Sequence, residues 1–548
     1  MKSLFNFILF VVISFSFVNA QSEFETGLKG ITDNVVQAQL EFLASDWMEG
    51  RETGTRGNEQ AADYIASMFK LYGLEPAGDI IRSYPSRRGG GEVIETPTYF
   101  QNFSLIEYSP GEDQNLSVIT SSQGTKKKIN FKHNVDFSVR SSSVGISIES
   151  PIVFVGYGFK SKDGDYNDFE DVNVKDKIIL RLSGYPGHKD TTSEAYKKYK
   201  PEGRWGIWML AREKNTAASE AGAIAVLEIN PDADPSLTWA VNYPFRYSEK
   251  HYEGTERLTA GVRNRMTLPG RDLSQSIITI EITERAASEI LNGTKIDLEE
   301  FEKNAMNRMK PASSELKGKS IFVETTVDSK IYKVRNVLGK IEGKNPNEVI
   351  VIGGHYDHVG MNKGYIWNGS DDNASGTVGV MTIAKAFAES GVKPEKTIIF
   401  AAWTGEEKGL LGSQYFVENY EPVNNIILNL NYDMISRTAE TDTLGVECSM
   451  TFTSTSPVLQ ETAEKLNEDI AANLKINFRG SEQPGGGSDH APFARKDIPI
   501  FYFMAGWHDD YHQPSDHADK ADINKMKNII RLGYGMIWEF AVNGTALK

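Results

Sequence analysis

Four uniformly apolar runs recur in the last 200 residues and alternate with segments of helical periodicity. The runs are EVIVIGG (348–354), KTIIFAAWTG (396–405), NIILNLNYDM (425–434) and DIPIFYFMAG (497–506). Between and after them, apolar residues recur at helical spacing in 376–390, 410–420, 456–474 and 523–542. Strands that are apolar on both faces and alternate with helices indicate a sheet covered on each side. The pattern therefore predicts an α/β fold, with a mostly parallel mixed sheet flanked by helices.

The earlier part of the chain has a different texture. Helical spacing marks two amphipathic segments, through Leu40, Leu43 and Trp47 and through Ala62, Ile65 and Phe69, and alternating apolar residues between 95 and 145 predict strands. Between 150 and 310, short β-like runs are separated by charged loops. We expect an inserted, mainly-β domain at 150–310. It would interrupt a main domain formed by 21–149 and 311–548.

The first twenty residues, MKSLFNFILFVVISFSFVNA, have the features of a signal peptide. A lysine near the start is followed by an apolar run too short for a typical membrane span, and Val18 and Ala20 occupy the small-residue positions before a cleavage point. Asn368 and Asn373 lie in glycosylation triplets within a loop that we interpret as catalytic below, where a glycan would obstruct it. We therefore expect a bacterial protein that is periplasmic or secreted.

Composition narrows the classes of partner. The net charge is −15, with 59 basic and 74 acidic residues, which argues against nucleic acid and gives no attraction to anionic membranes. No segment after the first twenty residues resembles a transmembrane helix, so we expect no stable membrane insertion after signal removal. The single cysteine, Cys448, excludes an internal disulfide.

Each of the four apolar runs leads into ionisable residues. His355 and Asp357, then Asp371 and Asp372, follow the first run; Glu406 and Glu407 follow the second, Asp433 ends the third, and His508, His512 and His517 follow the fourth. Because ligands bind beyond the carboxyl ends of parallel strands, we expect these side chains to converge at one edge of the sheet.

Imidazoles and carboxylates without a thiolate suit zinc in a catalytic site that keeps an open position. Several carboxylates also allow two metal ions that share one bridging carboxylate. In the Glu406–Glu407 pair, one residue could coordinate while the other accepts a proton. A serine nucleophile at Ser488 is disfavoured because GGGSDH is not a nucleophile elbow.

The motifs GGHYDH, NGSDDNASG, TGEEKGLLGS, NYDM, GSDHAPF and YHQPSD occur in this order over the last 200 or so residues. Together they resemble metallopeptidase family 28, which includes di-zinc aminopeptidases of the bacterial leucyl aminopeptidase and aminopeptidase Y type. Residues 43–76 resemble the leading helices of that family. The 150–310 region resembles the protease-associated domain often inserted in these enzymes.

The resemblance implies two zinc ions and a role for each motif residue. His355 and Asp433 would bind one zinc, Glu407 and His512 would bind the other, and Asp372 would bridge them. Glu406 would be the general base, and Asp357 would orient His355. The family's unusual cis peptide would fall at Asp372–Asn373. The remaining histidines, His358, His490, His508 and His517, are expected to support the site or to face solvent.

We therefore expect an exported zinc exopeptidase that hydrolyses the first peptide bond of peptides with a free N-terminus. The run FYFMAGW (501–507), with Met504 and Trp507, and Tyr511 beside His512 could line an apolar pocket that favours large hydrophobic N-terminal residues. Three alternatives stay open: a carboxypeptidase, for which Arg479 is one candidate carboxylate partner, a glutaminyl cyclase, and a non-catalytic binding protein on the same fold.

Overall fold

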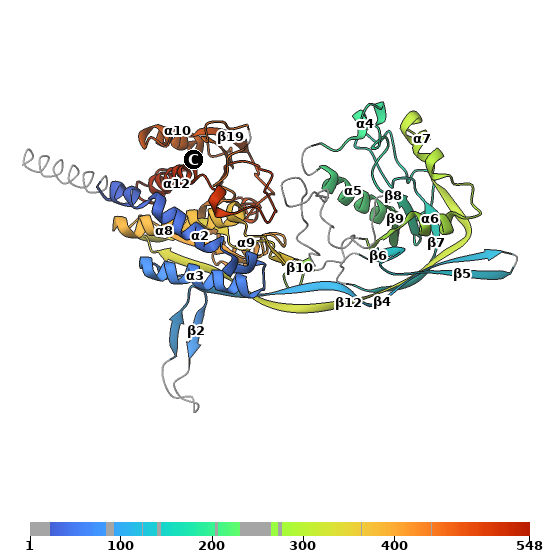
Figure 1. Cartoon of the computed structure of the whole chain (residues 1–548), viewed down its shortest axis with the longest axis horizontal. Helices are drawn as coiled ribbons and strands as arrows, with labels where there is room; N and C mark the ends of the chain where they lie inside the picture. Colours follow the sequence, from blue (N-terminus) through green and yellow to red (C-terminus); the bar gives the residue numbers. More distant parts are fainter. Residues whose placement is uncertain are drawn as a thin grey trace, which may run out of the picture. The chain divides into compact units, whose positions relative to one another are not determined.

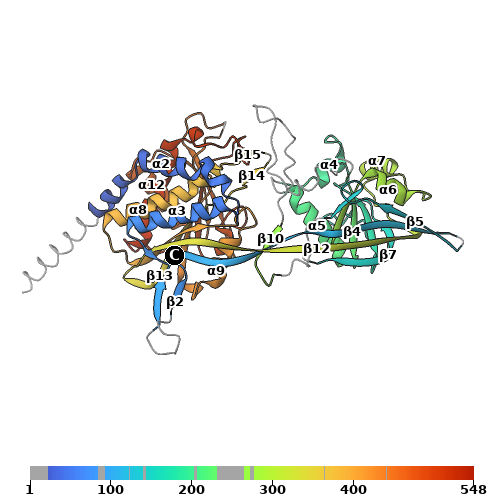
Figure 2. The ribbon, with the colours of Figure 1, turned by 60° about the horizontal axis from the view of Figure 1, so that its bottom comes forward.

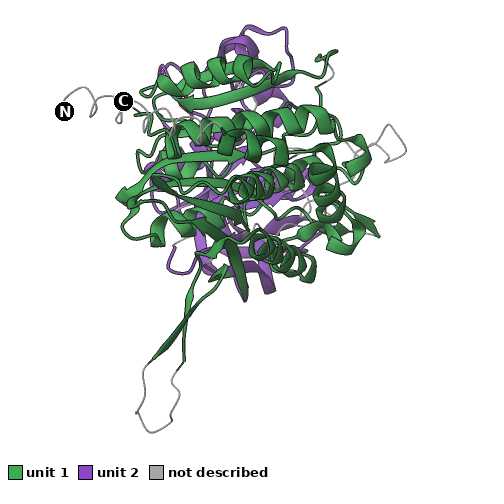
Figure 3. Cartoon of the chain, turned by 90° about the vertical axis from the view of Figure 1, so that its left-hand side faces the viewer, with its two compact units in different colours: residues 1–105, 249–260, 332–548 green, residues 106–248, 261–331 purple. Residues whose placement is uncertain are grey.

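The computed structural model describes residues 22–83, 93–122, 124–139, 144–202, 206–230, 265–271, 277–362, 364–439 and 441–547. The expected signal peptide lies outside these ranges. None of the helices within them combines the length and the apolar character needed to cross a bilayer. The chain divides into two compact units, residues 1–105, 249–260 and 332–548 (unit 1) and residues 106–248 and 261–331 (unit 2), which Figure 3 colours separately.

The sheet of unit 1 is built on the four predicted apolar runs. They form β13 (Asn345–His355), β16 (Lys396–Trp403), β17 (Ile426–Tyr432) and β20 (Ile500–Met504). Their order is β20-β17-β13-β16, and all three pairings are parallel. Antiparallel strands adjoin both ends: β18 (Glu447–Thr453) beside β20, and residues 337–341 of β12 (Ser314–Ile341) beside β16. β19 (Lys475–Ser481) pairs in parallel with β18.

Helices cover both faces of this sheet because alternate residues of each strand point to opposite sides. Ile350 and Ile352 of β13 join the core that includes α2 (Asp33–Leu43), α3 (Arg56–Tyr72), α8 (Gly376–Ser390), α10 (Val458–Asp469) and α12 (Ile523–Ala541). Val349 and Val351 join the opposite core with α9 (Leu411–Asn419) and α11 (Ala491–Ala494). Figures 1 and 2 show α2, α3, α8 and α12 gathered on one side of unit 1. The expected α/β fold is confirmed.

Unit 2 also contains a parallel sheet. Its strands β7 (Ile146–Phe154), β8 (Ile178–Leu182), β9 (Ala225–Ile229) and β11 (Thr279–Ile282) pair in that order, and β6 (Phe137–Val139) pairs antiparallel with β11. Residues 314–325 of β12 pair antiparallel with β7. The helices described in this unit are α4 (Glu194–Tyr199), α5 (Gly206–Glu220), α6 (Glu284–Leu291) and α7 (Leu298–Arg308).

The bounds of unit 2 differ from the expected insertion at 150–310. The long strand β4 (Phe100–Ser122) pairs with β5 (Thr125–Phe131), and both contribute buried residues to the unit 2 core. The chain passes between the units within β4 and again within β12, so strands contain these two boundaries, and the other two, at 248/249 and 260/261, lie outside the described residues. The likeness of this region to a protease-associated domain stays a prediction.

The remaining described elements are short. They are β1 (Glu75–Pro76), the hairpin of β2 (Ile80–Ser83) and β3 (Ile94–Pro97), β10 (Arg265–Thr267), the hairpin of β14 (Met361–Asn362) and β15 (Tyr365–Ile366), and the single turns η1 (Asp46–Arg51), η2 (Ser370–Ser375), η3 (Val423–Asn425) and η4 (Ala518–Lys520). Among these, η1 and η2 position the candidate site.

Candidate metal centre

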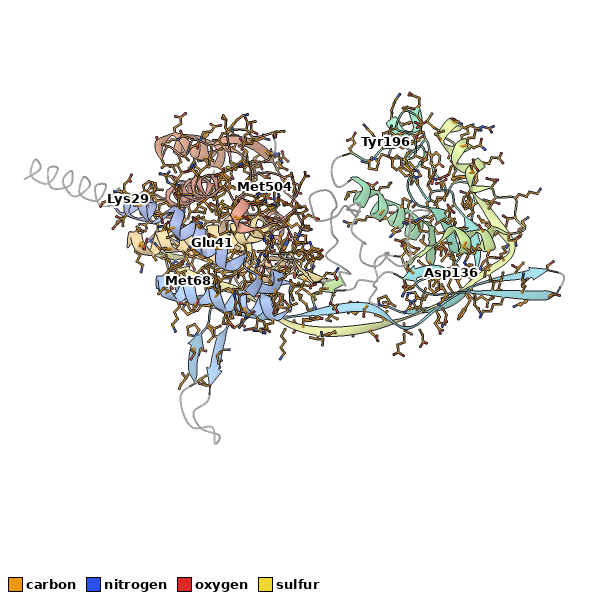
Figure 4. All side chains as sticks on the ribbon, in the orientation of Figure 1. Lys29, Glu41, Met68, Asp136, Tyr196 and Met504 are labelled. Carbon is orange, nitrogen blue, oxygen red and sulfur yellow. The ribbon has the colours of Figure 1, made fainter. Side chains whose placement is uncertain are left out.

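The carboxyl ends of the parallel strands bring the predicted residues together. His355 is the last residue of β13, Asp433 follows β17 directly, and Glu406 and Glu407 lie in the loop after β16. His512 lies in the loop after β20, whose last residue, Met504, is labelled in Figure 4. Asp372 belongs to η2, just before α8. Residues more than 150 positions apart in sequence thus share one edge of the sheet.

The first group of candidate ligands consists of His355, Asp372 and Asp433, which are all buried. The Nε2 atom of His355 lies 3.4 Å from Oδ1 of Asp372 and 3.5 Å from Oδ1 of Asp433. Glu406 lies beside this group, with its Oε2 atom 3.9 Å from the same nitrogen.

The second group consists of Asp372, Glu407, His512 and His358. Nε2 of His512 lies 2.8 Å from Oδ2 of Asp372 and 3.1 Å from Oε1 of Glu407. Nδ1 of His358 lies 3.0 Å from the same Glu407 oxygen and 3.8 Å from Oδ2 of Asp372. Asp372 therefore directs one carboxylate oxygen to each group, which is the arrangement of a bridging ligand.

The two adjacent aspartates differ in surroundings. Oδ1 of Asp371 accepts hydrogen bonds from the backbone N–H of Ser436 (2.7 Å) and its hydroxyl (2.8 Å), and Oδ2 lies 3.1 Å from Nε2 of His508. Asp371 thus holds neighbouring loops, whereas Asp372 faces both groups. The peptide bond between Asp372 and Asn373 is cis, as expected.

Asp357 acts on the site in two ways. Its backbone carbonyl lies 3.0 Å from Nδ1 of His355, while its carboxylate is 3.7 Å from that nitrogen. The carboxylate instead accepts hydrogen bonds from the hydroxyl of Thr53 (2.8 Å) and from the backbone N–H groups of Glu406 (3.2 Å) and Glu407 (3.3 Å). The nearer acceptor for His355 is therefore the main chain, and the carboxylate fixes the loop that carries both glutamates.

Several polar atoms at the centre lack a hydrogen-bond partner within the described ranges. They are Nε2 of His355, both ring nitrogens of His358 and Oδ1 of Asp433. Buried polar atoms are nearly always satisfied, so convergent exceptions point to an ion or water between them. Imidazole and carboxylate donors with no thiolate fit zinc.

Burial and mutual repulsion shift the pKa values of these groups. Burial, with the nearby charge of Asp433, raises the pKa of Glu406 well above its usual range. Burial opposes protonation of His355, but Glu406 and Asp433 raise the pKa of this histidine well above 6.5. Burial lowers the pKa of His358 to about 4, so this imidazole is neutral at pH 7. Such opposed shifts are typical of functional sites.

The N-terminal segment contributes Arg51, which the sequence did not identify. Its guanidinium is fully buried and donates hydrogen bonds to four backbone carbonyls, those of Leu43 (2.5 Å), Tyr356 (2.7 Å), Asn368 (2.7 Å) and Gly369 (2.9 Å). These bonds connect η1 to the segment directly after β13 and to the segment directly before η2. Arg51 therefore supports the loops that carry His355 and Asp372.

Residues 336–535 match the family described as Peptidase family M28. This part of the chain belongs to peptidase family M28. The matched residues of the M28 domain contain both ligand groups, and the expected family is confirmed.

Individual relatives agree with this assignment. A probable leucine aminopeptidase 2 from Aspergillus oryzae is 34% identical over 184 residues, which are 33% of this chain and 36% of that protein. A glutamate carboxypeptidase 2 homolog from Caenorhabditis briggsae is 25% identical over 89% of this chain and 64% of its own length. The chain thus spans about a third of the first relative and less than two thirds of the second.

Two solved structures share the fold. An aminopeptidase from Aneurinibacillus sp. strain AM-1 has a TM-score of 0.53 at 18% identity and covers 95% of this chain and 96% of its own. A zinc aminopeptidase from Bacillus subtilis has a TM-score of 0.50 at 18% identity, with 94% and 97% covered. Similarity at this identity supports the fold of the chain.

Aromatic rings border the M28 site beside His512. The ring of Tyr511 stacks on that of His512 at 3.9 Å between centroids, and Trp507, 40% exposed, meets Tyr511 edge-on at 4.9 Å. Phe501 and Phe503 of the same run lie in the core of unit 1, because they are inward-facing residues of β20. The expected apolar pocket therefore depends on Trp507 and Tyr511 rather than on the strand.

Proposed function

We propose that this protein is an exported di-zinc aminopeptidase. The observation that carries the proposal is the pair of candidate ligand groups sharing Asp372, the first buried and the second partly buried, with Glu406 beside the first group but in neither. His355 and Asp433 would hold one zinc ion, and Glu407 and His512 the other. Bound zinc would supply Lewis acidity that activates water and polarises the scissile carbonyl.

Glu406 is proposed as the general base and acid. Its side chain is 14% exposed and lies near the first group, and the partial burial favours the form that carries a proton. A carboxylate with a raised pKa can accept a proton from water and then deliver it to the departing amine. The hydrogen bond that the backbone N–H of Glu406 donates to the Asp357 carboxylate, at 3.2 Å, would keep this loop in place during both proton transfers.

Export and an N-terminal preference rest on further observations. The sequence of residues 1–20 supports export. The leucine aminopeptidase name of the Aspergillus oryzae relative supports an aminopeptidase with apolar preference, and Trp507 and Tyr511 provide an aromatic border beside His512.

A carboxypeptidase is the second candidate, because the Caenorhabditis briggsae relative is named a glutamate carboxypeptidase homolog. A substrate carboxylate would need a cation near the ligand groups. Arg437 is close in sequence to Asp433, but its guanidinium is paired with Asp510 (2.5 Å) and Asp516 (3.4 Å). Arg479 is exposed on β19. These placements favour the aminopeptidase.

Incubation of the zinc-loaded protein with a mixture of unblocked peptides, followed by mass spectrometry, tests the proposal. We expect stepwise loss of N-terminal residues. A Glu406→Gln variant should lose about 10²- to 10⁴-fold in kcat, the usual contribution of general acid–base catalysis, while its zinc content stays unchanged. Glu461→Gln, on the exposed surface of α10, is the matched control and should keep full activity.

Loss from the C-terminus would move the function to a carboxypeptidase, and ring closure at N-terminal glutamine would identify a cyclase. Full activity in Glu406→Gln would contradict the role of Glu406. A zinc-loaded protein that alters no peptide would support the binding-protein alternative.

A further inference from the structure

The two ligand groups differ in their number of candidate ligands, because the second group contains His358 as a fourth member. This histidine is buried, and both of its ring nitrogens lack a hydrogen-bond partner in the described part of the chain. Its Nδ1 atom lies 3.0 Å from Oε1 of Glu407, and its ring meets that of His512 edge-on at 5.4 Å between centroids. A buried imidazole whose Nδ1 faces oxygens of two candidate ligands needs an explanation.

The nitrogen–oxygen separations in the second group are close to those of a coordination shell. Four ligands at zinc bond lengths of about 2.05 Å occupy a tetrahedron with edges of about 3.3 Å. The four nitrogen–oxygen edges are 2.8 Å (His512–Asp372), 3.1 Å (His512–Glu407), 3.0 Å (His358–Glu407) and 3.8 Å (His358–Asp372). They scatter around that value on both sides, and all four atoms lie within 4.8 Å of one another.

The first group offers fewer ligand atoms. Among the described residues it contains three, from His355, Asp372 and Asp433, at separations of 3.4 and 3.5 Å from the imidazole nitrogen. Three protein ligands leave a fourth tetrahedral position for water or substrate, whereas four protein ligands close a site.

We propose that His358 is a fourth protein ligand of the second metal ion, which makes that site closed and leaves the exchangeable position on the first. The inference rests on the proposed di-zinc function and assigns different roles to the two ions. The His358 site retains its metal and fixes Asp372 and Glu407. The His355 site presents the open position next to Glu406.

The neutral Nδ1 of His358 would coordinate through its lone pair, with the proton on Nε2. A competing arrangement has Nδ1–H donating a hydrogen bond to Glu407, which would make His358 a positioning residue. The two arrangements predict different losses. Removing a supporting partner of a metal ligand typically weakens metal binding about 10- to 100-fold.

Metal titration of the wild-type protein, freed of metal by chelation, gives the first test. We expect the first equivalent of Co²⁺ to bind tightly with the intense visible bands of a four-coordinate ion, and the second to bind more weakly with a different spectrum. Two equivalents with the same affinity and spectrum would overturn the proposal. This readout needs no variant and no activity.

His358→Ala gives the second test. We expect one metal equivalent to lose more than about 100-fold in affinity, beyond the usual effect of a supporting residue. Added imidazole should restore the four-coordinate Co²⁺ spectrum by filling the vacated space. A loss below 100-fold, or no response to imidazole, would assign His358 to positioning and contradict the proposal.

His490→Ala is the matched control. His490 is equally buried, but its ring stacks on Tyr502 at 4.7 Å and belongs to neither ligand group. It should bind both equivalents as the wild type does. If His358→Ala binds both ions normally while the wild type still cleaves N-terminal residues, the inference fails and the proposed function stands. If His358→Ala loses one metal equivalent while the wild type cleaves no N-terminal residue, the inference stands and the proposed function fails.

Discussion

Both units bury charged side chains next to parallel strands, but they satisfy them differently. In unit 2, Arg181 donates to Glu228 at 2.7 Å and to Asn215 at 2.7 Å, and Lys214 donates to the carbonyls of Leu182 and Gly184, each at 3.0 Å. In unit 1, imidazole nitrogens and carboxylate oxygens face one another around two points.

The comparison separates structural charges from functional ones. The fold itself supplies partners for both buried cations, an acid and an amide oxygen for Arg181 and two backbone carbonyls for Lys214. Asp136, labelled in Figure 4, is a buried acid of unit 2 whose hydrogen bonds are also supplied by the fold. It accepts hydrogen bonds from Nε of Arg285 at 2.7 Å and from the backbone N–H of Lys132 at 2.8 Å. In unit 1, imidazole and carboxylate atoms of the described residues converge without such partners, which is an arrangement that suits a bound ion. Burial alone therefore does not identify a functional site.

Removing zinc should affect unit 1 most strongly. A bound ion whose free concentration is about 1,000 times its dissociation constant stabilises the folded state by about 4 kcal/mol. Cys448, buried in unit 1 and the only cysteine of the chain, provides a reporter of that unit. We expect chelation to accelerate the labelling of its thiol, and added zinc to reverse the change. Equal labelling rates with and without zinc would mean that the ligand groups hold no stabilising ion.

Glu228→Ala should have the next largest effect, in unit 2. It leaves Arg181, whose side chain is 2% exposed, without its acid, and removal of one partner from a buried pair costs about 3 kcal/mol or more. Calorimetry should show the loss in unit 2, while zinc content and Cys448 labelling stay at wild-type values. Glu228→Gln, which can still accept a hydrogen bond, is the control and should lose less. A variant that lost zinc would contradict the distinction between the units.

Asp442→Asn tests a satisfied pair within unit 1. Lys525 donates to Asp442 at 2.9 Å, and both side chains are buried. Burial opposes ionisation of Asp442, but hydrogen bonds from Lys525 and from the backbone of Glu447 and Val446 lower its pKa from 3.8 to about 2. Because the folded-state pKa lies below the unfolded value, the stabilisation is complete well above pH 4 and is lost as the pH falls towards 2.

The size of this effect follows from the shift. A lowering of nearly two pKa units corresponds to about 2 kcal/mol at pH 7. Urea unfolding of Asp442→Asn and wild type should differ by about that amount at neutral pH and converge near pH 2. A difference that persisted unchanged at low pH would show that the pair acts through packing rather than charge.

Much of the sheet could be predicted because β13, β16, β17 and β20 are apolar on both faces, and their ends then place the ionisable loops. The position of His358 could not be predicted in this way. It lies three residues after His355 on a loop, where neither strand nor helix periodicity decides which way a side chain points. The role of Arg51 could not be predicted from the sequence either. Its partners are backbone carbonyls, which every residue has, so no residue type in the sequence indicates them.

The boundary between the two units was the most difficult feature to predict from the sequence. Alternation between 95 and 145 indicates strands but not their partners, and β4 pairs with β5 and with residues of unit 2 far along the chain. Periodicity reports local conformation, whereas domain membership depends on contacts between distant segments.

The bonds of Arg51 also set an order of events in synthesis. They join residue 51 to carbonyls 305, 317 and 318 positions later, and the second ligand group still needs His512 near the end of the chain. A ribosome must therefore release almost the whole polypeptide before the second group is complete, whereas the first group needs no residue beyond Asp433. If the second group binds an ion as proposed, the capacity to bind it is among the last properties the molecule acquires.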